Sequence, residues 1–170
     1  MRTADLSDGR KALSPATDIH QATTANDIGR ARALFVEYAQ WLKVDLCFQG
    51  FAEEIKALPG AYAPPRGRLL LAGTTDDAFA CVALRPLAGA ELAEVKRLYV
   101  QPAHRGERWG YRLAEKLIAE ARVIGYRELK LDTLEWMTAA RALYASLGFR
   151  ECGAYYHNPL AGVVYMGLEL

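Results

Sequence analysis

The sequence is poor in the residues that build metal centres, disulfide frameworks and membrane spans. Its three cysteines lack CxxC spacing and lie far from its three histidines, so neither a zinc site nor a set of disulfides is expected. No apolar run approaches the roughly 20 residues that cross a bilayer. A net charge of +1 gives no general attraction to nucleic acid or to an anionic membrane. We therefore expect no metal, nucleic acid or membrane among its partners, and any anion site must be local.

The N-terminal stretch MRTADLSDGRKALSPATD also lacks the apolar segment of a signal peptide. We expect residues 1–17 to form a flexible polar tail and the protein to be cytoplasmic. The chain has 170 residues, of which 52% are apolar and 24% charged, which suits one globular domain with a sizeable core. Residues 18–170 are predicted to form that domain, as a monomer or a homodimer.

Hydrophobic periodicity predicts alternating strands and helices. Thr24 is a predicted N-cap for the first helix, and Thr138 for the last. The two apolar runs at 68–72 and 79–85 predict an antiparallel hairpin. We expect strands at 19–22, 68–72, 79–85, 93–100, 128–134, 149–153 and 163–168, and helices at 24–42, 51–58, 110–124 and 138–147.

The order β-α-α-β-β-β-α-β-α-β-β predicts a single α/β domain with a mixed sheet. A helix joins the strands at 93–100 and 128–134, so these two should be parallel with a right-handed crossover.

The chain is organised around the stretch YVQPAHRGERWGY, residues 99–111, which joins a strand to a long helix. A helix N-terminus presents unpaired N–H groups and a positive dipole end, which stabilise an anion. Gly106 and Gly110 would let the backbone approach that anion, while Arg105 and Arg108 add charge. The residues alone fit a phosphate cradle and a plain strand-to-helix turn equally well.

Longer strings add a resemblance. The chain resembles the GCN5-related N-acetyltransferase (GNAT) family in its order of elements and in two strings, LYVQPAHRGERWGYRLAEKLI and ALYASLGF. The likeness is closest to small bacterial members, which also carry stretches like DLCFQGF, LPGAYAPPRG and LDTL. The resemblance extends from about Ile19 to the C-terminus. It implies a central parallel pair of strands that splay apart, acetyl-CoA as co-substrate, and transfer of an acetyl group to a primary amine of a small molecule or peptide.

The family's signature, Gln/Arg-x-x-Gly-x-Gly/Ala, holds the pyrophosphate of acetyl-CoA through backbone amides. Arg105 and Gly110 match its first and last positions, whereas Arg108 replaces the middle glycine, and we expect altered affinity but retained binding. The backbone of the preceding strand should follow the pantetheine arm. The resemblance thus implies a cofactor site made of Leu98, Tyr99, Val100, Arg105, Gly106, Glu107, Arg108, Trp109, Gly110 and Tyr111.

Tyr144 in ALYASLGF matches the tyrosine that, in many relatives, is placed to protonate the departing CoA thiolate. The alternative is a tyrosine packed against the sheet for structural reasons. Relatives often carry an asparagine where this chain has Met137, so any contact made by that amide is absent here.

An amine nucleophile must also lose a proton, and Glu94 is the candidate base. Its alternative role is an ion pair with Lys96 or Arg97. Strand alternation would put Glu94, Lys96 and Leu98 on one face unless a bulge intervenes.

The acceptor pocket is expected between the loops at 43–50 and 154–162, which mix aromatic and polar residues. Its candidate substrate-binding residues are Phe48, Gln49, Tyr155, Tyr156 and His157. The sequence therefore predicts an acyl-CoA-dependent N-acetyltransferase that forms a ternary complex, with a non-catalytic acyl-CoA-binding or sensing domain as the alternative.

Overall fold

The computed structural model describes residues 18–74 and 76–170, which form one α/β domain; the predicted tail at 1–17 lies outside them. Their seven-stranded sheet has the order β1-β2-β3-β4-β5-β7-β6. Its strands are β1 (Asp18–Gln21), β2 (Arg68–Gly73), β3 (Ala78–Pro86), β4 (Leu92–Val100), β5 (Glu128–Leu134), β6 (Arg150–Glu151) and β7 (Val163–Glu169). Its α-helices are α1 (Ala25–Leu42), α2 (Phe51–Ala57), α3 (Trp109–Ile124) and α4 (Thr138–Ser146).

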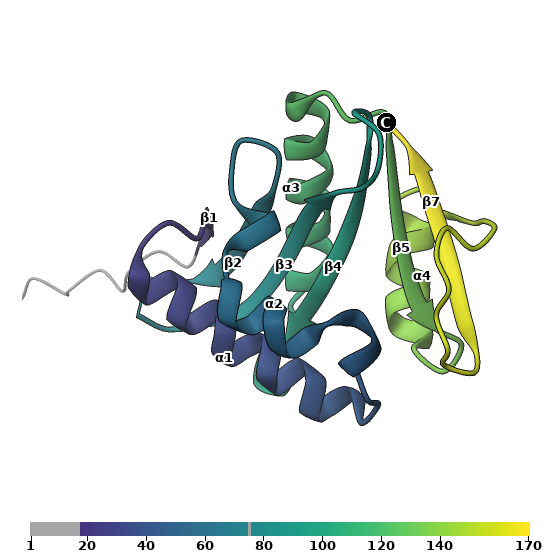
Figure 1. Cartoon of the computed structure of the whole chain (residues 1–170). Helices are drawn as coiled ribbons and strands as arrows, with labels where there is room; N and C mark the ends of the chain where they lie inside the picture. The colour runs from purple at the N-terminus through teal and green to yellow at the C-terminus, as the bar shows by residue number, and fades with distance from the viewer. Residues whose placement is uncertain (1–17, 75) are drawn as a thin grey trace, which may run out of the picture.

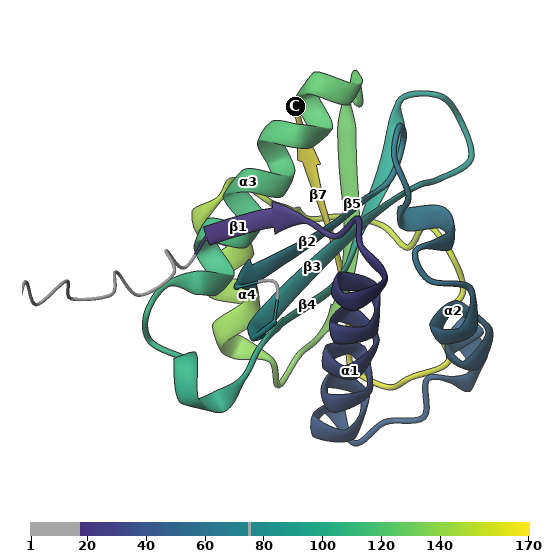
Figure 2. The same cartoon turned by 90° about the vertical axis from the view of Figure 1, so that its left-hand side faces the viewer.

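The helices cover both faces of the sheet. Figure 2 shows α1 and α2 on one face and α3 and α4 on the other. Leu113 and Leu117 of α3 and Tyr144 of α4 pack with one core cluster, while Leu34 and Phe35 of α1 belong to another. The predicted order of elements and the mixed sheet are therefore confirmed.

The local signals at the helix starts had different outcomes. Thr24 caps α1 as predicted, because its side chain accepts from the Asp27 backbone N–H and the Asp27 carboxylate accepts from the Thr24 backbone N–H. The prediction for Thr138 was wrong, since Thr138 is the first residue of α4 and Met137 is its N-cap, without a side-chain capping bond in the described residues. The strand predicted at 149–153 is shorter, and β6 contains two residues.

The two central parallel strands separate along their length. Residues 92–94 of β4 lie opposite residues 128–130 of β5. Beyond these pairs the strands diverge, and Figure 1 shows the opening widening towards the ends of both strands. On its other side β4 stays paired with β3 as far as Val100. The sheet is thus split on one side of β4, which leaves that edge of the strand open.

A β-bulge reorients the second half of β4. Cys81 pairs with Tyr99 and Ala83 with Lys96, so one residue of β3 opposes two of β4. Arg97 lies in the bulge with a φ of 58°, a left-handed conformation that is uncommon for a residue with a side chain.

The bulge moves Leu98 to the opposite face from Glu94 and Lys96. Leu98 packs with Val95 in the cluster on the α3 side. Simple alternation, which would put Leu98 on the face of Glu94, was therefore wrong for this strand, because the extra residue shifts every later side chain by one face.

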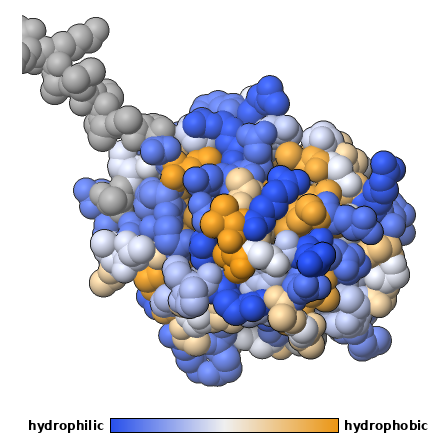
Figure 3. Space-filling model, turned by 90° about the horizontal axis from the view of Figure 1, so that it is seen from above, coloured by the Kyte–Doolittle hydropathy of each residue, from blue (hydrophilic) through white to orange (hydrophobic). Residues whose placement is uncertain are grey.

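One end of the molecule has a mixed surface. Viewed from above, the end at which β4 and β5 pair carries hydrophilic residues interspersed with small apolar groups (Figure 3).

Within residues 18–74 and 76–170, no helix combines the length and apolar character needed to cross a bilayer. The same residues contain no cluster of three or more His, Cys, Asp or Glu side chains arranged to hold a metal.

Candidate active site

A groove of about 590 Å³ runs along the turn between β4 and α3. It is bordered on the opposite side by Met137 and by residues of α4, among them Ala140 and Leu143. The predicted cofactor residues that line it are Leu98, Tyr99, Val100, Arg105, Gly106, Arg108, Trp109, Gly110 and Tyr111. The remaining one, Glu107, accepts a hydrogen bond from Trp109 Nε1 at 3.0 Å. The structure therefore brings the local signature together on one concave surface.

The N-terminus of α3 opens into this groove. Its N-cap is Arg108, and within the described chain this residue makes no side-chain capping bond. The first intrahelical bond runs from the Arg112 N–H to the Arg108 carbonyl at 3.0 Å, so the N–H groups of Trp109, Gly110 and Tyr111 precede the helical ladder. Together with the helix dipole, these groups form a site suited to an anion.

Arg108 adopts a φ of 63°, the left-handed region in which glycine has no steric penalty. The family signature has glycine at this position, and the backbone geometry gives a physical reason for it. The Arg108 guanidinium lies over the ring of Tyr111, 4.9 Å from its centroid. The side chain is therefore held at the helix terminus beside the anion site.

Arg105 connects the groove to helix α1. Its Nε donates to the Val100 carbonyl at 3.0 Å, and its guanidinium lies 4.8 Å from the ring centroid of Trp41. Trp41 also borders the groove, and its ring centroid lies 5.8 Å from that of Trp136, in the loop after β5. Arg105 and the two tryptophans thus link the two halves of the molecule beside the opening in the sheet.

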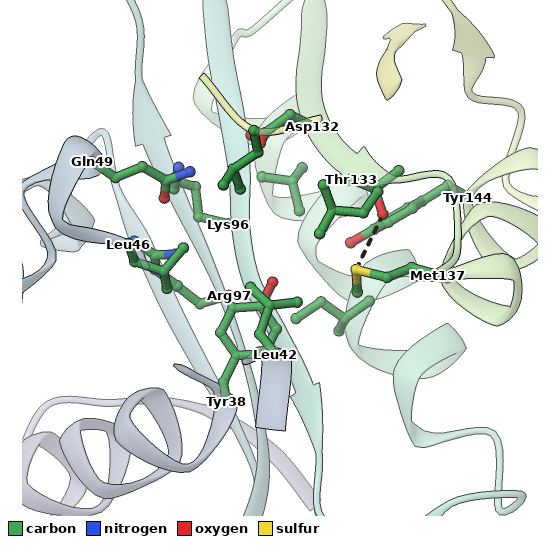
Figure 4. A pocket seen from close by; sticks show the side chains of 15 residues that line it. Tyr38, Leu42, Leu46, Gln49, Lys96, Arg97, Asp132, Thr133, Met137 and Tyr144 are labelled. Carbon is green, nitrogen blue, oxygen red and sulfur yellow. Dashed lines mark hydrogen bonds between the residues drawn. The ribbon is translucent and has the colours of Figure 1, made fainter. Parts of the chain in front are cut away.

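A second cavity, of about 70 Å³, lies in the opening between β4 and β5. Figure 4 shows Gln49 and Lys96 on one side of it and Asp132 entering from the side of β5. Its lining residues are Tyr38, Leu42, Leu46, Gln49, Val95, Lys96, Arg97, Leu98, Asp132, Thr133, Leu134, Met137, Ala140, Tyr144 and Leu160. Leu98, Met137 and Ala140 also border the cofactor groove, so the two spaces are neighbours that share these three residues.

Two tyrosine hydroxyls point into this cavity, from Tyr38 of α1 and from Tyr144 of α4 (Figure 4). Burial, with smaller contributions from Tyr38 and Asp132, raises the pKa of Tyr144 above its ordinary value. Burial likewise raises the pKa of Tyr38 to about 12. Both side chains therefore keep their protons at neutral pH, and each hydroxyl is available as a hydrogen-bond donor.

Glu94 is fully buried and surrounded by donors. Its Oε2 is 2.6 Å from Arg85 Nε, and its Oε1 accepts from the Tyr155 hydroxyl at 2.7 Å. Lys96 Nζ lies 3.6 Å from the same Oε1. Glu94 does not border the cavity between β4 and β5. The geometry therefore favours the ion-pair interpretation of this residue over direct contact with an acceptor.

The two loops predicted to form the acceptor pocket contribute unequally. Gln49 borders the cavity, and its Nε2 donates to the Tyr156 hydroxyl at 3.3 Å. Tyr156 and Tyr155 stand behind that lining, whereas His157 is exposed outside it. The side chain of Phe48 lies outside the described part of the structure. Of the four candidates whose side chains the structure describes, Gln49 is the one that borders the cavity.

Sequence reasoning missed Tyr38 and Asp132 as lining residues. Tyr38 fits the helical period of a core-facing residue, and nothing in its neighbours distinguishes it. Asp132 did carry a signal, because Glu128, Lys130 and Asp132 put three charges on one face of a strand that lies inside the sheet. Charged residues along an internal strand indicate a cavity or an ion-pair network.

A mixed sheet opened between two central parallel strands, with a helix N-terminus beside the opening, is the fold of the N-acetyltransferases. The model of the acetyltransferase (GNAT) family matches residues 32–149, and the chain belongs to this family. An uncharacterized N-acetyltransferase of Schizosaccharomyces pombe is 40% identical over 145 residues, covering 85% of this chain and 89% of the relative. This similarity to a fungal protein does not support the expected assignment to the bacterial members.

Solved structures share the fold at low sequence identity. An acetyltransferase from Streptococcus agalactiae has a TM-score of 0.73 and 19% identity, covering 91% of this chain and 98% of that one. An aminoglycoside 6'-N-acetyltransferase in complex with coenzyme A has a TM-score of 0.68 and 16% identity, covering 89% and 96%.

Proposed function

We propose that this protein transfers an acetyl group from acetyl-CoA to a primary amine of a small molecule or peptide, by direct attack within a ternary complex. The observation that carries the proposal is that the groove and the cavity adjoin and share Leu98, Met137 and Ala140 in their lining. A donor in the groove and an acceptor in the cavity would approach each other through the opened sheet. Such an arrangement lets positioning supply much of the rate.

The residues around the groove fit acetyl-CoA. The pyrophosphate would accept from the N–H groups at the start of α3, with Arg108 adding positive charge. The pantetheine arm would follow the open edge of β4 at residues 98–100, where β5 has diverged. The thioester would then lie near Met137, which borders both spaces.

The chemistry needs one proton donor and one proton acceptor. The acceptor ammonium first loses a proton, and its nitrogen then attacks the thioester carbonyl carbon. As the new C–N bond forms and the C–S bond breaks, the thiolate takes a proton from the Tyr144 hydroxyl. The second proton of the nitrogen restores that hydroxyl. One amide, one CoA thiol and one released proton result.

We assign receipt of the first proton to Asp132, not to Glu94. Asp132 borders the acceptor cavity, and a base must reach the amine directly or through one water. Glu94 is held by Arg85, Lys96 and Tyr155 behind that lining, so we propose that it positions Lys96.

The alternative of a non-catalytic acyl-CoA-binding domain is not favoured. It was motivated by Arg108 and Met137, which depart from the family pattern. Both residues border the groove without closing it, and a cavity for a second substrate lies next to it. The presence of that second cavity supports catalysis over binding alone.

A CoA-release screen with amino acids, polyamines, aminoglycosides and peptide N-termini tests the proposal. We expect release with at least one amine, and a large loss of kcat in Tyr144→Phe, because the thiolate then lacks its donor. Tyr126→Phe is the matched control, since its hydroxyl binds the Arg66 carbonyl at 2.8 Å away from both cavities. Calorimetry without acetyl-CoA binding would overturn the function, and full activity of Tyr144→Phe would overturn the role of the tyrosine.

A further inference from the structure

Six charged side chains lie in or next to the acceptor cavity, and four of them form short ion pairs. Arg85 Nε is 2.6 Å from Glu94 Oε2, and Arg97 donates to both carboxylate oxygens of Glu54, at 2.9 and 2.6 Å. Within each pair the positive and the negative charge neutralise each other. The remaining two are Lys96, whose longer ion pair of 3.6 Å is with the already paired Glu94, and Asp132; they carry opposite charges, and both border the cavity.

Lys96 and Asp132 face the same space from opposite sides of the split sheet. In the register of the parallel strands, Glu94 of β4 lies opposite Lys130 of β5. Lys96 lies two residues beyond Glu94, and Asp132 lies two residues beyond Lys130. Because the strands have diverged there, the two side chains do not form an ion pair with each other in residues 18–74 and 76–170. A lysine and an aspartate held apart across a cavity leave room for a molecule that presents a negative group to the lysine and a positive group to the aspartate.

The Lys96 ammonium has spare hydrogen-bonding capacity. Its side chain is 5% exposed, and its charged neighbour is Glu94 Oε1 at 3.6 Å, an oxygen that already accepts from Tyr155. An ammonium has three donors, and burying it without close acceptors is costly. Burial accordingly lowers the pKa of Lys96, against the opposing effect of Glu94. An anionic group in the cavity would supply the missing acceptors.

The opposite side offers acceptors for an amine. Asp132 Oδ2 receives a hydrogen bond from the neutral amide of Asn158 at 3.0 Å, and within residues 18–74 and 76–170 its carboxylate forms no ion pair. Gln49 Oε1 is buried, borders the same cavity and has no hydrogen-bond partner among the described residues. A carboxylate and an unpartnered amide oxygen together suit the N–H groups of an ammonium.

We propose that the acceptor is a primary amine that also carries a carboxylate, as an amino acid does, with its carboxylate bound by Lys96 and its amine by Asp132 and Gln49. This inference rests on the proposed acetyltransferase function and names its substrate class. The cavity volume of about 70 Å³ suits such a compact head group. Each charge of the acceptor then meets a partner of opposite sign in the cavity lining, and a polyamine would leave Lys96 facing a like charge.

Matched substrates test the proposal without any variant. CoA release is measured with the twenty amino acids, with their carboxamides and with the corresponding amines that lack the carboxyl group. We expect kcat/KM for at least one amino acid to exceed that of its carboxamide by roughly tenfold to a hundredfold, the range expected for a lost charged hydrogen bond. Equal or better use of carboxamides or plain amines, or the absence of release with every amino acid, would overturn it.

The variant Lys96→Met provides a second test of the proposal. We expect its KM for the amino acid to rise by a similar factor, so that the preference for the amino acid over its carboxamide falls towards one, while its acetyl-CoA binding by calorimetry stays close to that of the wild type. An equal loss with both substrates would indicate a merely structural lysine and overturn the proposal. Failure of the function itself looks different, since acetyl-CoA binding or CoA release is then missing for every amine in the wild type.

Discussion

The guanidinium of Arg97 holds the carboxylate of Glu54 through two hydrogen bonds, although Arg97 itself occupies a β-bulge with a positive φ. The pair joins β4 to helix α2 beneath the acceptor cavity. Arg97 Nη2 is 2.6 Å from the carboxylate, and both side chains are largely buried. The pair thus fixes the point at which β4 turns its later residues towards the cofactor groove.

Substitution of Glu54 should therefore lower stability in a pH-dependent way. Burial alone would raise the pKa of Glu54, but the hydrogen bonds and charge of Arg97 outweigh it and hold the pKa below 4.5. A depressed carboxyl pKa contributes stability above 4.5 that is lost as pH falls through the lower value in the folded state. Glu54→Gln should cost about 3 kcal/mol at pH 7, the range for breaking a buried pair, and this difference should shrink as pH falls below 4.5 and through the lower pKa of the folded state.

Thermal unfolding of both proteins between pH 7 and pH 3 measures this difference. Glu53→Gln is the matched control, because Glu53 is exposed and pairs with Lys56 on the surface, where ion pairs contribute little. A constant difference between Glu54→Gln and the wild type across the range would contradict the linkage.

Two substitutions at position 108 should separate backbone strain from charge. Arg108→Gly removes the guanidinium and relieves the positive φ of 63°, a gain of about 1 kcal/mol, whereas Arg108→Ala removes the charge and keeps the strain. We expect the glycine variant to be the more stable by thermal unfolding. Both should bind acetyl-CoA more weakly and with a smaller salt dependence than the wild type. Unchanged salt dependence would show that Arg108 does not act on the phosphates.

The clustering of the signature residues on one groove could be predicted from the sequence, whereas the residues of the acceptor cavity could not. The turn at 99–111 places its functional groups within thirteen consecutive residues, and strand and helix periodicity fix their order. The cavity instead gathers Tyr38, Lys96 and Asp132 from three elements. Neither glycine nor proline marks the bulge at Arg97, so strand alternation alone put Leu98 on the wrong face. Tertiary contacts, such as the Glu54 pair, support that bulge.

The pair of tryptophans beside the opening should contribute to donor binding. Trp41 borders the groove. Trp136 is 54% exposed and packs against Trp41, with 5.8 Å between the two ring centroids. An aromatic pair is worth about 0.5–1.5 kcal/mol, so Trp136→Ala should weaken acetyl-CoA binding roughly twofold to tenfold. Val123→Ala is the control, because this side chain is 83% exposed on α3. Calorimetric titration measures both, and equal affinities would contradict a role for Trp136.

The last prediction distinguishes the two carboxylates of the site. Glu94→Gln keeps an acceptor for Tyr155 but leaves Arg85 and Lys96 without their anion, so it should lower the melting temperature substantially. If Glu94 is a positioning residue, the variant should keep the shape of the pH profile of kcat. Asp132→Asn should instead lower kcat strongly at neutral pH, because the acceptor amine then lacks its proton acceptor, and the loss should shrink at high pH, where the amine deprotonates in solution. A normal melting temperature in Glu94→Gln, together with a large loss of kcat at neutral pH that high pH reverses, would return the role of base to Glu94.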